Sequence, residues 1–204
     1  MALAFLEKGI PVLGVLGCPN LAVNERRGVI FAADMSSSDC RVYPTSAGDM
    51  EAEEEPVDEN SSEGFHVKAP PLADVELARF CESVEKAHSD HSLSANIAAE
   101  AGLSRQPYRI DSQCKYGVVA TGEASLYLRI PRGDGYREKI WDHAAGVVVV
   151  QTAGGCVTDL DGKTLDFSRG HLLTENRGVV ATSGGIHNRV LDAVKRLGIY
   201  TGSH

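Results

Sequence analysis

One stretch of this sequence, WDHAAGVVVVQTAGG over residues 141–155, sets the first expectations for both fold and site. Its length and small residues predict a buried helix, and the pair Gly154 and Gly155 is typical of a helix C-terminus. Four consecutive valines favour a strand instead, because β-branched residues suit extended backbone. Length and the flanking glycines favour the helix. Asp142 stands at its start, where the carboxylate either caps the helix or points outward toward a cation or a phosphate.

The composition is that of a globular protein. The chain has 204 residues and 43% hydrophobic content, which suits one large or two small domains. No window approaches the ~20 apolar residues of a membrane-spanning helix, and we expect no membrane partner. The five cysteines are odd in number and scattered, without metal-ligand spacing. We therefore expect a reducing compartment, the cytoplasm in the first place and an organelle as the alternative.

The net charge of −8 comes from one segment. Ten of the acidic residues lie between positions 34 and 64, in a Ser-rich stretch without a hydrophobic stripe. This composition predicts a disordered loop, with an acidic interaction segment as the functional alternative. Residues 105–139 carry seven basic and four acidic residues, a local surplus that suits a doubly phosphorylated ligand. We expect no nucleic-acid partner.

The order of apolar runs predicts an α/β domain. The turn residues and the hydrophobic spacing place helices near 90–102, 112–121 and 186–197. Strands are expected over 2–6, 10–18, 29–33, 75–84, 124–129, 156–158 and 178–181. The chain is thus divided into strands at 1–33, an acidic loop at 34–66 and an α/β domain at 67–204.

The motifs resemble those of the inositol monophosphatase superfamily, whose second signature is Trp-Asp, a variable residue, small residues and Gly-Gly. The longer run 136–146 is similar to the 3′(2′),5′-bisphosphate nucleotidase branch of that superfamily. Further matches follow in the same order at 85–88, 111–116, 127–131 and 165–167. The resemblance implies the C-terminal part of a layered α/β sandwich, with mixed sheets, helices between them and residues 1–33 as remnant strands of a first domain.

Two metal-binding elements of that superfamily are missing here, a Glu-Glu pair and an Asp-Pro-Ile/Leu-Asp-Gly-Thr motif. The run DLDGKTL at 159–165 imitates the second element, and it also resembles the first motif of haloacid dehalogenase phosphatases. Its two Asp residues stand two positions apart instead of three, which argues against the superfamily motif. The inserted Lys163 argues against the haloacid dehalogenase motif. An Asp-Gly pair predicts a turn at this point instead.

The resemblance implies a magnesium-dependent phosphatase that converts adenosine 3′,5′-bisphosphate to AMP and phosphate, a reaction of sulfur metabolism. Asp142 is then both a metal ligand and a substrate-binding residue, because Mg²⁺ prefers carboxylate oxygens. One carboxylate does not make a site for several metal ions, so we expect this chain to turn over poorly. The other residues that the resemblance assigns to the nucleotide are Glu85, His88, Ser112, Lys115 and Arg129.

Several alternatives stay open. Ser112 caps a helix, His88 is structural and Arg129 lies on the surface if the resemblance misleads. In one alternative the chain is a catalytically dead paralog that binds nucleotides. In another it is an enzyme of the same superfamily whose substrates are inositol phosphates. Residues 2–18 have the pattern of a strand pair that expects neighbours, so self-association through this face is also expected.

Overall fold

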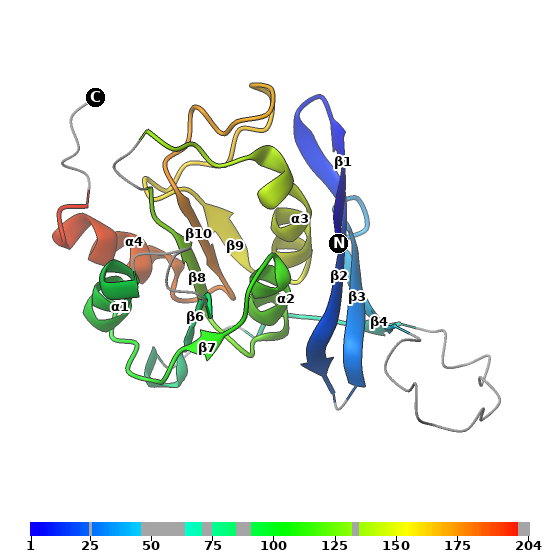
Figure 1. The fold of residues 1–204 in the computed structure, drawn as a ribbon, viewed down its shortest axis with the longest axis horizontal. Coiled ribbons are helices and arrows are strands. Elements are labelled where there is room, and N and C mark those ends of the chain that lie inside the picture. The colour runs from blue at the N-terminus through cyan, green and yellow to red at the C-terminus, as the bar shows by residue number, and fades with distance from the viewer. Residues whose placement is uncertain (25, 46–63, 71–74, 85–90, 132–134, 200–204) are drawn as a thin grey trace.

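The computed structural model describes residues 1–24, 26–45, 64–70, 75–84, 91–131 and 135–199. They form two five-stranded sheets, ordered β1-β2-β3-β4-β5 and β7-β6-β8-β10-β9. Figure 1 shows α2 and α3 between the two sheets, and α1 and α4 on the far side of the second sheet. The expected layered α/β architecture is confirmed.

The first sheet is antiparallel throughout. Leu16 and Cys18 are buried on its inner face, whereas Leu3 and Phe5 are 64% and 59% exposed on the other. The two strands expected near the N-terminus are confirmed, so this sheet has one covered and one open face. Its strands are β1 (Ala2–Glu7), β2 (Ile10–Val23), β3 (Arg26–Asp34), β4 (Asp39–Pro44) and β5 (Phe65–His66).

The acidic segment contains more regular structure than expected. β4 and β5 lie within the 34–66 range that was expected to be a disordered loop, so that expectation is wrong at both ends. The turn before β4 is closed by Asp34, whose Oδ1 accepts the Ser36 amide at 2.8 Å and the Ser36 hydroxyl at 2.7 Å. Asp and Ser in this pattern form a local turn rather than a disordered chain. Residues 46–63 lie outside the described part.

The second sheet is mixed. β6 runs parallel to β7 and β8, and β10 runs antiparallel to β8 and β9. Only part of the stretch 75–84 is a strand, because a 3₁₀ turn, η3 (Val75–Leu77), precedes it. The strands are β6 (Phe80–Glu82), β7 (Tyr108–Arg109), β8 (Leu126–Arg129), β9 (Cys156–Thr158) and β10 (Val179–Thr182).

The valine-rich segment is a helix, as its length predicted. Its end is a Schellman motif, in which the Gly155 amide donates to Val150 O at 2.8 Å and the Gly154 amide to Gln151 O at 3.0 Å. Asp142 does not cap this helix, because the N-cap position is His143 and Asp142 belongs to the preceding 3₁₀ turn, η5 (Ile140–Asp142). The helices are α1 (His91–Glu100), α2 (Cys114–Thr121), α3 (Ala144–Thr152) and α4 (His187–Arg196).

Close packing brings α2 and α3 onto the first sheet. A Cβ at Gly14 on β2 would lie 2.7 Å from Ala145 O, and one at Gly117 on α2 would lie 2.6 Å from the Phe31 ring. Glycine is therefore required at both positions for backbone and ring to approach. Within the described part of the chain, no helix is long and apolar enough to cross a membrane.

Candidate functional site

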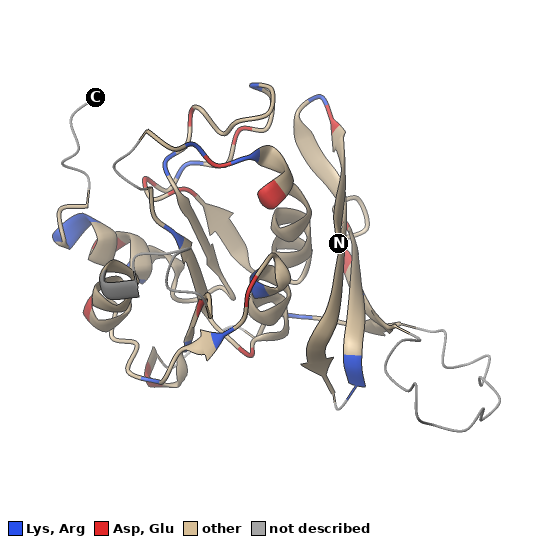
Figure 2. Ribbon diagram, viewed as in Figure 1, with Lys and Arg blue, Asp and Glu red and all other residues tan. Residues whose placement is uncertain are grey.

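A cavity of about 440 Å³ opens where the end of β8, the start of α2 and the turn before α3 meet. Four of the residues expected to bind the nucleotide line it: Ser112, Lys115, Arg129 and Asp142. Figure 2 shows acidic and basic segments alternating along the loop that leads into α3. The other two expected residues, Glu85 and His88, lie outside the described residues.

Lys115 is a buried residue of the cavity lining. Its Nζ donates to Ser83 Oγ at 3.1 Å and to Ile110 O at 3.4 Å, and lies 5.4 Å from the centre of the Tyr127 ring. Burial lowers the pKa of Lys115, because removal from water disfavours its charged form. An anion in the cavity would offset that cost.

Arg129 forms a two-point ion pair with Glu138. Its Nε donates to Oε1 and its Nη2 to Oε2, each at 3.3 Å. The two side chains are 24% and 7% exposed, so water screens the pair only weakly. Burial raises the pKa of Glu138, but the hydrogen bond from His143 and the charge of Arg129 outweigh it and hold the pKa below its usual value. Glu138 is therefore a carboxylate at neutral pH.

His143 extends this pair into the core. Its Nε2 lies 2.9 Å from Glu138 Oε2, and its Nδ1 lies 2.6 Å from the Tyr116 hydroxyl. With Nε2 donating to the carboxylate, Nδ1 of the neutral ring accepts the Tyr116 hydrogen. Tyr116 and His143 are 0% and 1% exposed. A continuous hydrogen-bonded chain thus runs from the core to the guanidinium.

The loop before α2 is held in a fixed shape. Asp111 Oδ1 accepts the Val84 amide at 3.0 Å, and Ser112 Oγ accepts the Cys114 amide at 3.3 Å. Ser112 has a φ of 64°, a left-handed conformation that is costly for a residue other than glycine. Gln113 Nε2 donates to Trp141 O at 2.7 Å and so links this loop to the turn that carries Asp142.

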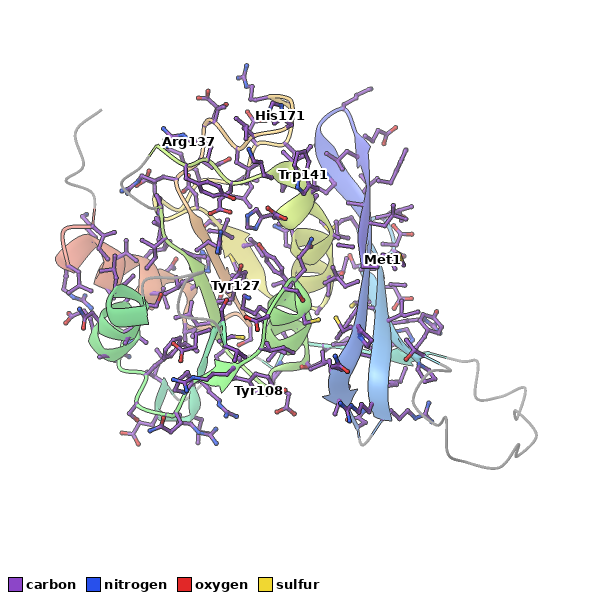
Figure 3. All side chains as sticks on the ribbon, in the orientation of Figure 1. Met1, Tyr108, Tyr127, Arg137, Trp141 and His171 are labelled. Atoms are coloured by element: carbon purple, nitrogen blue, oxygen red, sulfur yellow. The ribbon has the colours of Figure 1, made fainter. Side chains whose placement is uncertain are left out.

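The same turn is fixed from outside by an aromatic stack. The rings of Trp141 and His171 are nearly parallel at 13°, with 6.3 Å between their centroids. Figure 3 shows both residues at the end of the molecule near the β1–β2 hairpin, and Tyr127 on the inner side of the second sheet. Trp141, which precedes Asp142, is therefore held both by the Gln113 hydrogen bond to its carbonyl and by this stack.

The described residues do not by themselves form a metal site. They contain no group of three His, Cys, Asp or Glu side chains that could hold a metal ion. Glu138 is already engaged by Arg129 and His143, and Asp111 by the Val84 amide. Asp142 is the remaining carboxylate of the cavity wall, beside Asp111 and Glu138.

The DLDGKTL segment is a structural turn, as its Asp-Gly pair predicted. Asp159 is fully buried, and its Oδ1 accepts the amides of Asp161 and Lys163 at 2.9 and 2.8 Å. Its Oδ2 accepts from Asn176 Nδ2 at 3.1 Å. A carboxylate with this many donors fixes a loop and is not available as a nucleophile.

Residues 1–198 match the inositol monophosphatase family. The chain belongs to that family. The match covers both sheets and all four helices described above. Enzymes of this family are metal-dependent.

Relatives within the inositol monophosphatase family are similar in sequence. The chain is 39% identical over 213 residues to a 3′(2′),5′-bisphosphate nucleotidase of Emericella nidulans, covering 97% of this chain and 57% of the relative. It is 42% identical over 195 residues to one of Oryza sativa, covering 96% of this chain and 53% of the relative. The chain therefore spans little more than half the length of these curated relatives.

Solved structures of the inositol monophosphatase family show the same fold at low identity. An inositol monophosphatase from Anabaena aligns with a TM-score of 0.61 at 18% identity, covering 96% of this chain and 63% of that one. SuhB of Mycobacterium tuberculosis aligns with a TM-score of 0.60 at 19% identity, covering 96% and 63%. These likenesses show the fold alone.

Sequence reasoning missed part of this family member's cavity wall. Glu138 and His143 both stand inside the run 136–146, yet Asp142 alone of that run was expected to be a site residue. A carboxylate and an imidazole within five positions of each other were the available signal. The full set of missed lining residues is Ser83, Asp111, Gln113, Tyr127, Tyr136, Glu138 and His143.

Proposed function

We propose that the cavity binds adenosine 3′,5′-bisphosphate and that this chain is a magnesium-dependent bisphosphate nucleotidase of weak activity. The reaction would consume water and release phosphate and AMP. The convergence of Lys115 and Arg129 on one cavity carries the proposal. The bisphosphate nucleotidases among the relatives support the choice of substrate.

The chemistry of the lining suits a ligand with more than one phosphate. A guanidinium can bind a phosphate through two parallel hydrogen bonds, and an ammonium adds a second positive centre. Arg129 and Lys115 come from β8 and α2, so they approach the cavity from different elements. The volume of about 440 Å³ lies within the ordinary range for small-molecule sites.

Asp142 is proposed as the point of contact with Mg²⁺ in this site. Magnesium is bound by carboxylates together with substrate phosphates and water, so a single Asp contributes without completing a cage. The described residues supply that carboxylate but no metal-binding cluster around it. We therefore propose weak magnesium binding and slow turnover for this chain.

The lack of a metal cluster among the described residues favours one second candidate, nucleotide binding without turnover. Glu85 and His88 remain proposed contacts to the nucleoside, on the resemblance alone. An inositol phosphate substrate stays the alternative within the same family. Such a substrate differs from adenosine 3′,5′-bisphosphate in having no nucleobase.

A phosphate-release assay separates these functions. The purified chain is incubated with Mg²⁺ and either adenosine 3′,5′-bisphosphate or inositol 1-phosphate, beside Asp142→Asn. We expect slow release from the nucleotide, and less from the inositol phosphate. Rapid turnover abolished by Asp142→Asn would refute the slow-turnover claim, and a preference for inositol phosphate would refute the nucleotide assignment.

A further inference from the structure

We infer that Tyr116, His143 and Glu138 form a buried positioning chain that fixes the orientation of the Arg129 guanidinium at the cavity. Glu138 and Tyr116 would thus influence ligand binding through Arg129 rather than by contact with the ligand. The inference deepens the proposed function and rests on it for the identity of the ligand. The hydrogen bonds among these residues do not depend on the identity of that ligand.

The first link is the contact between carboxylate and guanidinium. Both Glu138 oxygens face Arg129, with Nη2 to Oε1 at 3.2 Å and Nη2 to Oε2 at 3.3 Å, beside Nε to Oε1 at 3.3 Å. Such a two-point contact fixes the plane of the guanidinium and not only its position. A phosphate that uses parallel hydrogen bonds requires a fixed plane.

The second link fixes the carboxylate. His143 Nε2 lies 2.9 Å from Oε2, the same oxygen that accepts from Arg129 Nη2. Glu138 therefore cannot rotate without losing hydrogen bonds on two sides. Its burial makes each such loss costly, because an unpaired buried charge or donor is left behind.

The third link anchors His143 to the core. The Tyr116 hydroxyl contacts Nδ1 at 2.6 Å, and the Tyr116 ring packs edge-to-face on Tyr127 at 5.0 Å and 87°. Tyr116 is fully buried on α2, whereas His143 is the N-cap residue of α3. Through these hydrogen bonds, the orientation of Arg129 depends on the positions of both α2 and α3.

The charge of Glu138 argues for this role. A carboxylate in the wall of a phosphate-binding cavity repels the ligand, so on charge alone its removal should tighten binding. A positioning role predicts the opposite, that removal of the carboxylate weakens binding. A purely structural role predicts a loss of stability with unchanged affinity in variants that remain folded. Measurements of ligand affinity and of thermal stability together distinguish these three outcomes.

The first experiment titrates adenosine 3′,5′-bisphosphate by calorimetry into the wild-type chain, Glu138→Gln, Glu138→Asp and Tyr116→Phe, with a thermal melt of each. We expect affinity about tenfold lower in both Glu138 variants and several-fold lower in Tyr116→Phe, from loss of a charge-assisted hydrogen bond. Asp161→Asn is the matched control, because it breaks the 2.7 Å Arg177 pair away from the cavity. Its affinity should not change.

The second experiment needs no ligand. The ¹H–¹⁵N signal of the Arg129 Nε–H group, assigned by its loss in Arg129→Lys, should be protected from exchange with water in the wild-type chain. It should shift and exchange faster in Glu138→Gln and in folded Tyr116→Phe. If the nucleotide fails to bind but this signal responds, the proposed function fails and the positioning chain stands. An unchanged signal in both variants, or tighter binding by Glu138→Gln, would overturn the inference.

Discussion

Gly146 on α3 lies directly against the ring of Tyr116 on α2, with no room for a methyl group between them. The glycine of the signature run thus makes space for the tyrosine whose hydroxyl holds His143. The signature therefore joins a packing requirement at Gly146 to a cavity residue at Asp142.

Gly146→Ala tests this relationship. The added methyl must displace a fully buried ring, and overpacking of this kind costs about 1–3 kcal/mol, more than the ~1 kcal/mol that alanine gains in a helix. We expect a lower free energy of unfolding in urea denaturation, with weaker nucleotide binding. Gly17→Ala is the control, since its Cβ would meet nothing closer than 3.7 Å. Equal stability of the two variants would contradict the packing argument.

Lys115→Met should separate binding from stability. The buried ammonium is disfavoured by loss of water, as its lowered pKa shows, so an apolar side chain of similar length should leave the melting temperature equal or higher. Affinity for adenosine 3′,5′-bisphosphate should fall about tenfold or more, as expected for a charged contact. Lys163→Met, outside the cavity, provides the comparison. Unchanged affinity in Lys115→Met would remove this residue from the site.

Cys114 should be more reactive than the other cysteines. A hydrogen bond from Cys18, with help from Ser112 and the terminal amine, lowers the pKa of the Cys114 thiol despite its partial burial. Because the thiolate is the reactive form, the alkylation of Cys114 should reach its plateau at a lower pH than that of an ordinary thiol. Cys156 has a pKa raised by burial and should react only at higher pH. Mass spectrometry after iodoacetamide pulses at each pH distinguishes the two, and equal profiles would contradict the assignment.

The open face of the first sheet should mediate self-association. Leu3, Phe5, Ile10 and Leu13 are all exposed on β1 and β2, and exposed apolar strands attract partners. We expect the sedimentation coefficient to rise with protein concentration, and Phe5→Glu to abolish the rise. A concentration-independent monomer would show that the face does not pair with itself.

Local patterns foretold much of the fold. The helix at Ala144–Thr152 and its Gly154–Gly155 terminus follow from length and glycine placement within one segment. β4 was missed because acidic flanks hid its alternation, in which Cys40 and Val42 are buried. The alternation of apolar and polar residues in this segment, and not the net charge around it, was the sequence signal that indicates a strand.

The site was foreseen less completely, for a physical reason. Motif resemblance placed Ser112, Lys115, Arg129 and Asp142 together because each stands in a local run. The contact between Tyr116 and His143 joins residues 27 positions apart, and only the packing of α2 on α3 brings them together. Asp142 failed as a cap because the chain makes a 3₁₀ turn there before the helix begins.

Binding of a doubly phosphorylated nucleoside by Lys115 and Arg129 can be measured in solution. The experiment is isothermal titration of the wild-type chain with adenosine 3′,5′-bisphosphate, AMP and adenosine. We expect one site, with affinity falling in that order and the bisphosphate affinity sharply reduced in Arg129→Met. Absence of bisphosphate binding, or equal affinity for adenosine, would contradict it.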